Sequence, residues 1–118
     1  MTEQTKVKYS ENGLWILKDG EHYRIGLSEK GQDDLGEVMF VEIPTDVARV
    51  EKNDNLIGVE GAKAVTELIA PFSGKVMSFN TELADNPEDL NTSNRDKNWI
   101  VDVTEVDEAE FNALSDEV

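Results

Sequence analysis

The chain has 118 residues, and its 26 acidic against 11 basic side chains give a formal net charge of −15. A surface of this charge repels phosphate backbones and anionic headgroups, so we expect binding neither to nucleic acid nor to membranes, and no apolar run approaches the roughly 20 residues of a membrane-spanning helix. The length suits one domain over residues 1–118, and the lack of cysteine excludes disulfides, thiolate metal sites and cysteine nucleophiles.

Strand patterns dominate the first two-thirds of the chain. Residues 14–17 and 22–26 flank Asp19-Gly20, whose residue types favour the positive φ angles of a hairpin turn. Proline cannot donate a ladder hydrogen bond, so Pro44 should end the strand before it. Further strands are expected over residues 36–43, 47–50, 56–60, 65–70, 75–79 and 99–103.

Short helical segments are expected among these strands. Ser28 suits the N-cap and Gly36 the C′ position of one or two helical turns. Residues 86–90 favour a single turn, and residues 107–114 a C-terminal helix with Phe111 on its core face. The sequence therefore predicts a mainly β fold with short helices, one of them C-terminal.

Residues for independent catalysis are sparse. His22 is the only histidine, and a lone histidine in a strand is more often exposed or packed than catalytic. Asp85, Glu88 and Asp89 lie close in sequence but lack the glycine and alternating oxygen ligands of a calcium loop. Phosphate-binding glycine loops and nucleophile elbows are missing as well. We therefore expect a protein that is not an enzyme.

The start of the chain and its charge indicate where in the cell the protein works and which partner surfaces it meets. The first six residues are polar and lack the apolar segment of a secretion signal, which together with the lack of cysteine favours a cytoplasmic protein. The acidic surface serves solubility in the simplest interpretation, and it steers the protein toward basic partner surfaces in the functional one.

Lys63 is the most informative side chain. It lies in Val59-Glu60-Gly61-Ala62-Lys63-Ala64-Val65, at the expected tip of a hairpin between two strands. The small neighbours Ala62 and Ala64 leave its amine open to an enzyme that attaches a group to it, and acylation would remove the ammonium charge. From the spacing alone, an ordinary surface lysine in a turn is the simpler interpretation.

Several separated segments match one family in register. Val59-Glu60-Gly61-Ala62-Lys63-Ala64 is similar to the lipoylation motif Val-Glu-Ser-Val-Lys-Ala, and Ala70-Pro71-Phe72-Ser73-Gly74-Lys75-Val76 is similar to Ala-Pro-Val-Ser-Gly-Glu-Val. Residues 35–44 are similar to Leu-Gly-Asp-Ile-Val-Phe-Val-Glu-Leu-Pro. Downstream, the family's order and spacing are kept by Leu83, Asp85-Asn86-Pro87-Glu88, Asn91 and Trp99. The chain thereby resembles the glycine cleavage system H-protein family over nearly its whole length.

The resemblance implies a fold and a cofactor. The fold is a lipoyl-type hammerhead, a flattened barrel of two small antiparallel sheets with Lys63 on a turn between two strands. The cofactor is lipoate, amide-linked to Lys63, with Glu60, Gly61, Ala62 and Ala64 as the motif that the attaching enzyme recognises. Biotin is disfavoured, because methionines flank the lysine of biotin carriers and alanines flank Lys63. For Glu60 and Glu67, a role in recognition competes with simple solvation.

The resemblance also implies a non-catalytic carrier and its partners. A lipoate ligase or lipoyl transferase would attach the group, and the dithiolane would accept an aminomethyl group from glycine decarboxylase. The aminomethyltransferase would then receive that group, and lipoamide dehydrogenase would reoxidise the arm. The chemistry belongs to the cofactor, and tethering raises its effective concentration at each partner.

Three segments depart from the family pattern. Glu11-Asn12-Gly13-Leu14-Trp15 keeps only the tryptophan of Ser-His-Glu-Trp, Asn94-Arg95-Asp96-Lys97-Asn98-Trp99 replaces Pro-Tyr-Gly-x-Gly-Trp, and Gly61-Ala62 replaces Ser-Val. One alternative is therefore an H-like carrier used in lipoyl relay to other enzymes, or in reversible ADP-ribosylation by a sirtuin and a macrodomain protein. Another is an unmodified interaction module.

Overall fold

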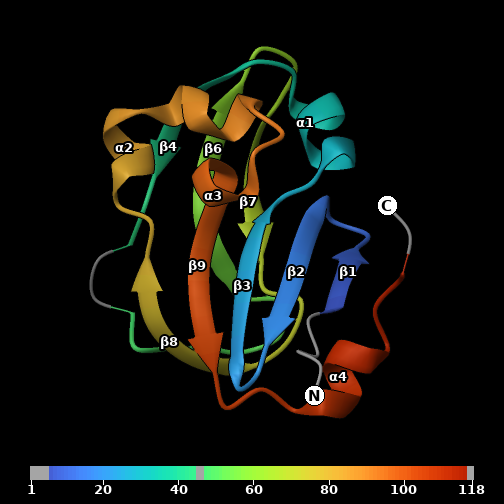
Figure 1. Ribbon diagram of the computed structural model, residues 1–118. Helices are drawn as coiled ribbons and strands as arrows, with labels where there is room; N and C mark the ends of the chain where they lie inside the picture. Colours follow the sequence, from blue (N-terminus) through green and yellow to red (C-terminus); the bar gives the residue numbers. More distant parts are fainter. Residues whose placement is uncertain (1–5, 45–46, 117–118) are drawn as a thin grey trace.

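The computed structural model describes residues 6–44 and 47–116, in which strands form two antiparallel sheets. The large sheet has the order β1-β2-β3-β9-β8-β5 and the small one the order β4-β6-β7. Figure 1 shows the small sheet behind the large one. The strands are β1 Lys6–Ser10, β2 Leu14–Asp19, β3 His22–Leu27, β4 Val38–Glu42, β5 Arg49–Val50, β6 Asn55–Gly61, β7 Val65–Ile69, β8 Gly74–Phe79 and β9 Trp99–Thr104.

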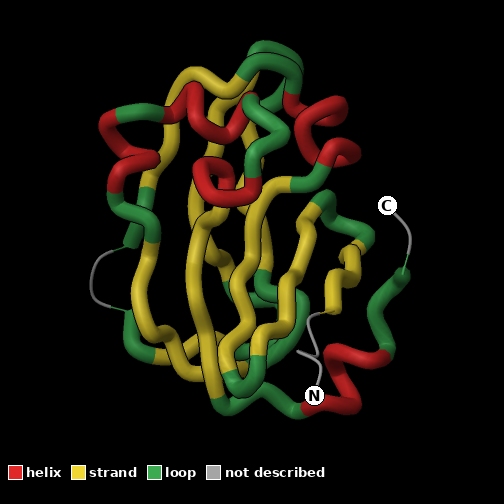
Figure 2. The backbone as a smooth tube through the Cα atoms, in the orientation of Figure 1, coloured by secondary structure: helices red, strands yellow, loops and turns green. Residues whose placement is uncertain are grey.

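Short helices cover the two ends of these sheets. They are α1 Glu29–Leu35, α2 Glu82–Asp85, the 3-10 helix η1 Pro87–Asn91, α3 Arg95–Asn98 and α4 Glu108–Asn112. Figure 2 shows the first four gathered at one end of the molecule and α4 at the other. The predicted mainly β fold with two antiparallel sheets and a C-terminal helix is confirmed. The sheets are unequal, with six and three strands, and their strand orders are open within the described residues, so they do not close into a barrel.

The core lies between the two sheets and beneath the helices. Tyr23 of β3 belongs to this core, with its ring edge-on to Phe72 at 5.6 Å and to Phe111 at 5.2 Å between centroids. Phe72 precedes β8 and Phe111 belongs to α4, so these contacts join three distant parts of the chain. Burial of such aromatic rings contributes about 1.5–3 kcal/mol each to folding.

Most predicted elements are present with shifted ends. The hairpin at Asp19-Gly20 is confirmed, with a φ of 65° at Gly20. Ser28 caps α1, since its side chain accepts a hydrogen bond from the Gly31 amide at 3.3 Å. The strand expected over residues 47–50 shrinks to β5, because only Arg49 and Val50 pair with β8.

Three elements went unpredicted because their sequences lack periodic apolar residues. β1 alternates lysines with few apolar side chains, and it is a strand because each of its residues pairs with β2. α2 and α3 are four-residue turns, too short to show a helical period. The cap of α3 still follows local chemistry, since the Asn94 side chain accepts a hydrogen bond from the Asp96 amide at 2.9 Å, whereas Thr81 before α2 makes no side-chain cap hydrogen bond.

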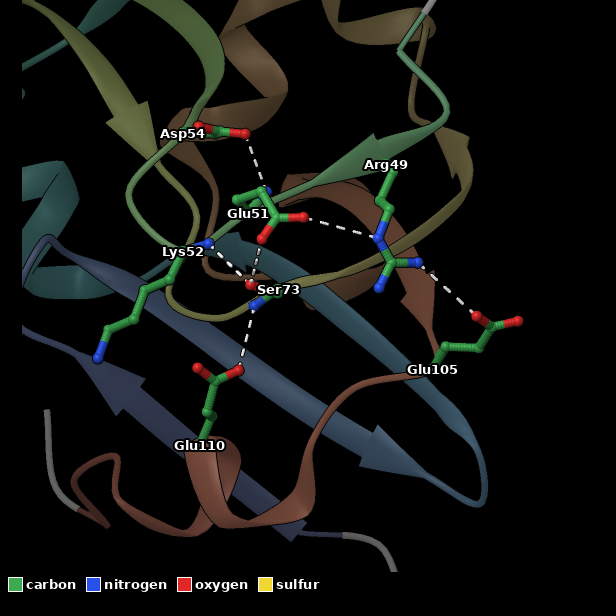
Figure 3. A network of polar contacts seen from close by, with 7 residues as sticks. All are labelled: Arg49, Glu51, Lys52, Asp54, Ser73, Glu105 and Glu110. Carbon is green, nitrogen blue, oxygen red and sulfur yellow. Dashed lines mark hydrogen bonds and ion pairs between the residues drawn. The ribbon is translucent and has the colours of Figure 1, made fainter.

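A polar network ties the turns at the α4 end of the molecule (Figure 3). The Lys52 amide donates to Ser73 Oγ at 3.0 Å, and Ser73 Oγ donates to a Glu51 carboxylate oxygen at 3.3 Å. The Ser73 amide donates to Glu110 of α4 at 3.3 Å. The segment Ala70–Gly74, one of those that carry the family resemblance, is therefore part of the scaffold, with Phe72 in the core and Ser73 in this network.

Candidate functional site

Lys63 lies on the tight turn between β6 and β7, as expected. Glu60 pairs with Val65 at the end of the two strands, and the Gly61 amide donates to the Ala64 carbonyl at 2.8 Å to close the turn. Lys63 is exposed, and so are Ala62 and Ala64 on either side of it. The amine is therefore presented to solvent on a short turn whose strands are held in a sheet.

The tip is also bound to the carboxyl end of α1, which the sequence did not indicate. The Lys63 amide donates to the Leu35 carbonyl and the Ala62 amide to the Glu37 carbonyl, both at 2.9 Å. The Lys63 side chain reaches the same helix end, where Nζ donates to the Asp33 carbonyl at 3.0 Å. Two backbone bonds and one side-chain bond thus restrain a turn that would otherwise project freely.

Two glycines permit this approach. A Cβ at Gly61 would lie 2.3 Å from the Leu35 carbonyl oxygen, which no real side chain tolerates. Gly36 has a φ of 73°, and a Cβ there would lie 3.0 Å from Lys63 Cγ. The departure from Ser at position 61 therefore has a physical reason, since only glycine fits against the end of α1 at this distance.

The positive charge of Lys63 is favourable at the carboxyl end of α1. The last turn of α1 has no basic residue of its own, and its carbonyl groups carry the negative end of the helix dipole. The Lys63 ammonium supplies a positive charge there from another element. Acylation would remove that charge but leave one N–H on Nζ.

The other motif residues fall in different environments. Gly61 is buried under α1, whereas Glu60 is exposed and points to the outer face of the small sheet. There Glu60 lies between Phe40 of β4 and Val65 of β7 in one cross-strand row. The five residues of the predicted motif therefore do not form one continuous surface.

A groove of about 300 Å³ opens beside the tip. It runs from Ala64 along β7 to the β1–β2 turn, and it includes three carboxylates, those of Glu11, Asp34 and Glu67. Sequence reasoning missed this groove, because its walls come from three separate parts of the chain. Its lining residues are Glu11, Asn12, Gly31, Asp34, Leu35, Ala64, Thr66, Glu67 and Leu68.

Two of the departing segments pack on each other. Trp15 is 2% exposed and its indole Nε1 donates to Asn98 Oδ1 at 2.9 Å, while the guanidinium of Arg95 lies 5.6 Å from the Trp15 ring. Leu14 is fully buried. Leu14, Trp15 and Asn98 are thus packed inside the molecule, whereas Arg95 is exposed. Of the same segments, only Glu11 and Asn12 line the groove beside the tip.

The described residues hold no group of three or more His, Cys, Asp or Glu side chains that could bind a metal ion. His22 is an exposed residue at the start of β3. Among the helices of the same residues, none is long and apolar enough to cross a membrane.

Comparisons with known proteins place the chain in a family. The family described as Glycine cleavage H-protein matches residues 7–118. The chain belongs to the glycine cleavage H-protein family. It is a non-catalytic carrier with the family's lipoyl-carrier role in glycine cleavage, and it works with the enzymes of that system. The alternatives of lipoyl relay and ADP-ribosylation are not favoured by these matches.

Individual relatives agree with this assignment. A glycine cleavage system H protein of a Geobacillus species is 40% identical over 114 residues, which are 97% of this chain and 90% of the relative. One of Listeria welshimeri is 40% identical over 106 residues, or 90% of this chain and 85% of the relative. The crystal structure of a glycine cleavage system H protein from Mycobacterium marinum superposes with a TM-score of 0.73 at 27% identity, covering 84% of this chain and 83% of that one.

Proposed function

We propose that this carrier holds lipoate as an amide on Lys63 Nζ. The observation that carries the proposal is the exposed amine on a turn closed by the Gly61–Ala64 hydrogen bond and restrained against α1. An enzyme can recognise such a turn as a fixed shape, and the modified side chain then starts from a defined point.

The surroundings of Lys63 fit the group. Its Nζ donates to a backbone carbonyl, that of Asp33, and an amide N–H can make the same bond after the positive charge is lost. The cost of acylation is then the loss of one favourable interaction with the end of α1, of about 0.3–1 kcal/mol. Lys63 belongs to none of the ion pairs that the described residues form, so acylation breaks none of these.

The bound group supplies a dithiolane whose sulfur accepts and releases the aminomethyl group. The chain's own residues position the start of the arm and shape what lies next to it. The groove that begins at Ala64 carries the carboxylates of Glu11, Asp34 and Glu67, so its potential favours a cationic amine over an anion.

We further infer that glycine decarboxylase, the aminomethyltransferase and lipoamide dehydrogenase act on the same arm in turn, after a lipoate ligase or lipoyl transferase has attached it. A tether of fixed length raises the effective concentration of the group at each active site. Glu60, Gly61, Ala62 and Ala64 take part in recognition through the turn they form, with Gly61 setting its position on α1.

Mass analysis of the protein tests the attachment. Incubation of the chain with a lipoate ligase, lipoate and ATP should add one lipoyl group, and peptide mapping should find it on Lys63. Lys63→Arg should remain unmodified, because arginine keeps the charge but lacks an acylatable amine. Its unfolding midpoint should stay near that of the wild type, since Lys63 is exposed. Full lipoylation of Lys63→Arg at another lysine would overturn the assignment.

A further inference from the structure

An apolar strip adjoins the Lys63 tip on the outer face of the small sheet. The described residues include four large, exposed hydrophobic side chains, and three of them, Met39, Phe40 and Val65, belong to β4 and β7. Phe40 is 58% and Val65 77% exposed. The fourth, Met77, lies on β8 of the other sheet.

The strand register brings these side chains together. Phe40 pairs with Glu60, and Glu60 pairs with Val65, so the three form one row across β4, β6 and β7. A register shift between Val38 and Phe40 leaves Met39 exposed next to Phe40. The neighbouring Val41 and Val59 point the other way and are 3% and 2% exposed. The small sheet thus has one face in the core, and its other face exposes a row in which Glu60 lies between the apolar side chains of Phe40 and Val65.

The next row makes a hollow in this face. It consists of Glu42, Gly58 and Glu67, and Gly58 has no side chain to fill the centre. The resulting groove has a volume of about 470 Å³, and Phe40, Val65 and three carboxylates line it. An apolar groove between acidic side chains suits an apolar protrusion that is surrounded by basic residues.

We propose that this surface, formed by Phe40, Glu42, Gly58, Glu60, Val65 and Glu67, docks the enzyme that attaches lipoate to Lys63. The inference rests on the proposed function and specifies which partner binds here. The attaching enzyme must bring an activated acyl group into bonding distance of Nζ, so its surface must lie against the turn and the strands that lead into it. An enzyme that acts on the far end of the finished arm reacts at atoms an arm's length away from Nζ, so its reaction does not itself require the acyl-transfer site to lie against this turn.

The attachment step explains why close docking is required. The Nζ–C bond forms while the bond from the acyl carbon to its activating phosphate breaks, so the phosphate group leaves with the bonding electrons and the lysine ammonium gives up two protons. Val65 lies two residues after Lys63, so a partner seated on Val65 and Phe40 also lies beside the turn. The Lys63 side chain must leave the Asp33 carbonyl on the α1 side to reach that partner.

The charge of the surface argues against a second copy of the chain as its occupant. Two such faces would bring Glu42, Glu60 and Glu67 of each copy together, in a protein whose net charge is already −15. Like charges facing each other in an interface are destabilising. A partner with a basic rim meets no such repulsion.

Lipoylation kinetics of the unmodified full-length chain test the proposal. The double variant Phe40→Ser with Val65→Thr removes the apolar side chains of the exposed row, and Met77→Ser is the matched control on the other sheet. With a lipoate ligase, lipoate and ATP, kcat/KM for the double variant should fall about tenfold or more, mainly through KM, as expected for loss of an apolar anchor. The control should stay within about twofold of the wild type.

A second measurement distinguishes docking of the attaching enzyme from a general effect of the two substitutions on all partners. The double variant, fully lipoylated by long incubation, should be loaded with the aminomethyl group by glycine decarboxylase at a rate close to that of the wild type. Its reduced dithiol arm should likewise be reoxidised by lipoamide dehydrogenase with NAD⁺ at a rate close to that of the wild type. Equal losses with these enzymes, or no loss with the ligase, would overturn the inference. A dimer in sedimentation that the double variant abolishes would also overturn it. A wild-type chain that the ligase leaves unmodified would instead remove the proposed function itself.

Discussion

Gly61 sets how closely the lysine turn approaches the rest of the molecule. Its α-carbon faces the carbonyl of Leu35, and the missing side chain lets the Lys63 and Ala62 amides reach the end of α1. Any larger residue must push the turn and the helix end apart, and those hydrogen bonds lengthen as a result. A single methyl group therefore decides whether the turn is restrained.

We predict that Gly61→Ala destabilises the fold by about 1–3 kcal/mol, because the new Cβ would lie 2.3 Å from the Leu35 oxygen. Gly58→Ala in the same strand is the control, since its Cβ would meet Glu42 only at ordinary contact distances of 3.6 Å and more. That variant should stay within about 0.5 kcal/mol of the wild type. Urea unfolding of both proteins measures the difference, and equal midpoints would contradict the close contact.

At the scale of elements, the helices at the tip end are joined to the small sheet by side chains that take the place of strand partners. Asn91 at the end of η1 is the clearest case. Its Oδ1 accepts from the Val38 amide at 2.8 Å and its Nδ2 donates to the Val38 carbonyl at 3.3 Å. One amide side chain thus pairs with the start of β4 as a neighbouring strand would.

We predict that Asn91→Ala costs about 1–2 kcal/mol of stability, because it leaves both backbone groups of Val38 without their protein partner. Hydrogen exchange at the Val38 amide should speed up more than exchange at the centre of β9. Asn112→Ala, at an exposed position of α4, is the control and should leave both rates unchanged. Unchanged protection of the Val38 amide in Asn91→Ala would show that the Asn91 side chain does not hold β4.

At the scale of the whole molecule, the two ends of the described chain are held together by polar contacts. Tyr9 of β1 exchanges two backbone hydrogen bonds with Ser115, at 2.7 and 3.0 Å. Lys8 pairs with Asp116 at 2.7 Å, and Lys18 of β2 pairs with Glu108 of α4. The C-terminal segment therefore lies along the edge strand β1 and protects it from further pairing.

These ion pairs make the attachment of the C-terminal segment to β1 and β2 sensitive to acid. The hydrogen bond from Lys18 lowers the pKa of Glu108, and the hydrogen bond from Lys8 lowers the pKa of Asp116. A carboxylate whose pKa is lower in the folded state stabilises that state above its unfolded pKa, and the contribution is lost as the pH falls through the folded pKa. The attachment of the C-terminal segment should therefore weaken below about pH 4, where unperturbed carboxylates titrate.

We expect the protection factor of the Tyr9 amide to fall between neutral pH and about pH 3, while amides at the centre of β9 keep theirs. A local probe is needed because protonation also relieves the general repulsion of a chain with a net charge of −15, which acts in the opposite direction. Lys8→Met should make the Tyr9 amide less protected at neutral pH and less sensitive to acid. Protection that does not change with pH would rule out this role for the pairs.

Much of the fold followed from local patterns. The Asp19-Gly20 turn, the Ser28 cap and the exposed position of Lys63 all depend on residues within a few positions of one another, so the sequence predicted them correctly. The strand β1 escaped prediction because its pairing with β2, and not its own composition, makes it a strand. The sequence likewise did not predict that the two sheets stay open, since closure into a barrel depends on which strand edges pair.

The sequence by itself determined the alternation of strands and turns, the presentation of Lys63 between small neighbours and the family that these segments resemble, because each depends on short stretches of chain. Only the tertiary structure decided that the turn is bound to α1, that Glu60 faces Phe40 and Val65, and that two grooves flank the tip. Those contacts join Asp33 to Lys63 and Phe40 to Glu60, residues far apart in sequence, through the packing and register of the sheets. Residues close in sequence form the turn, and the strand register determines which side chains lie around it.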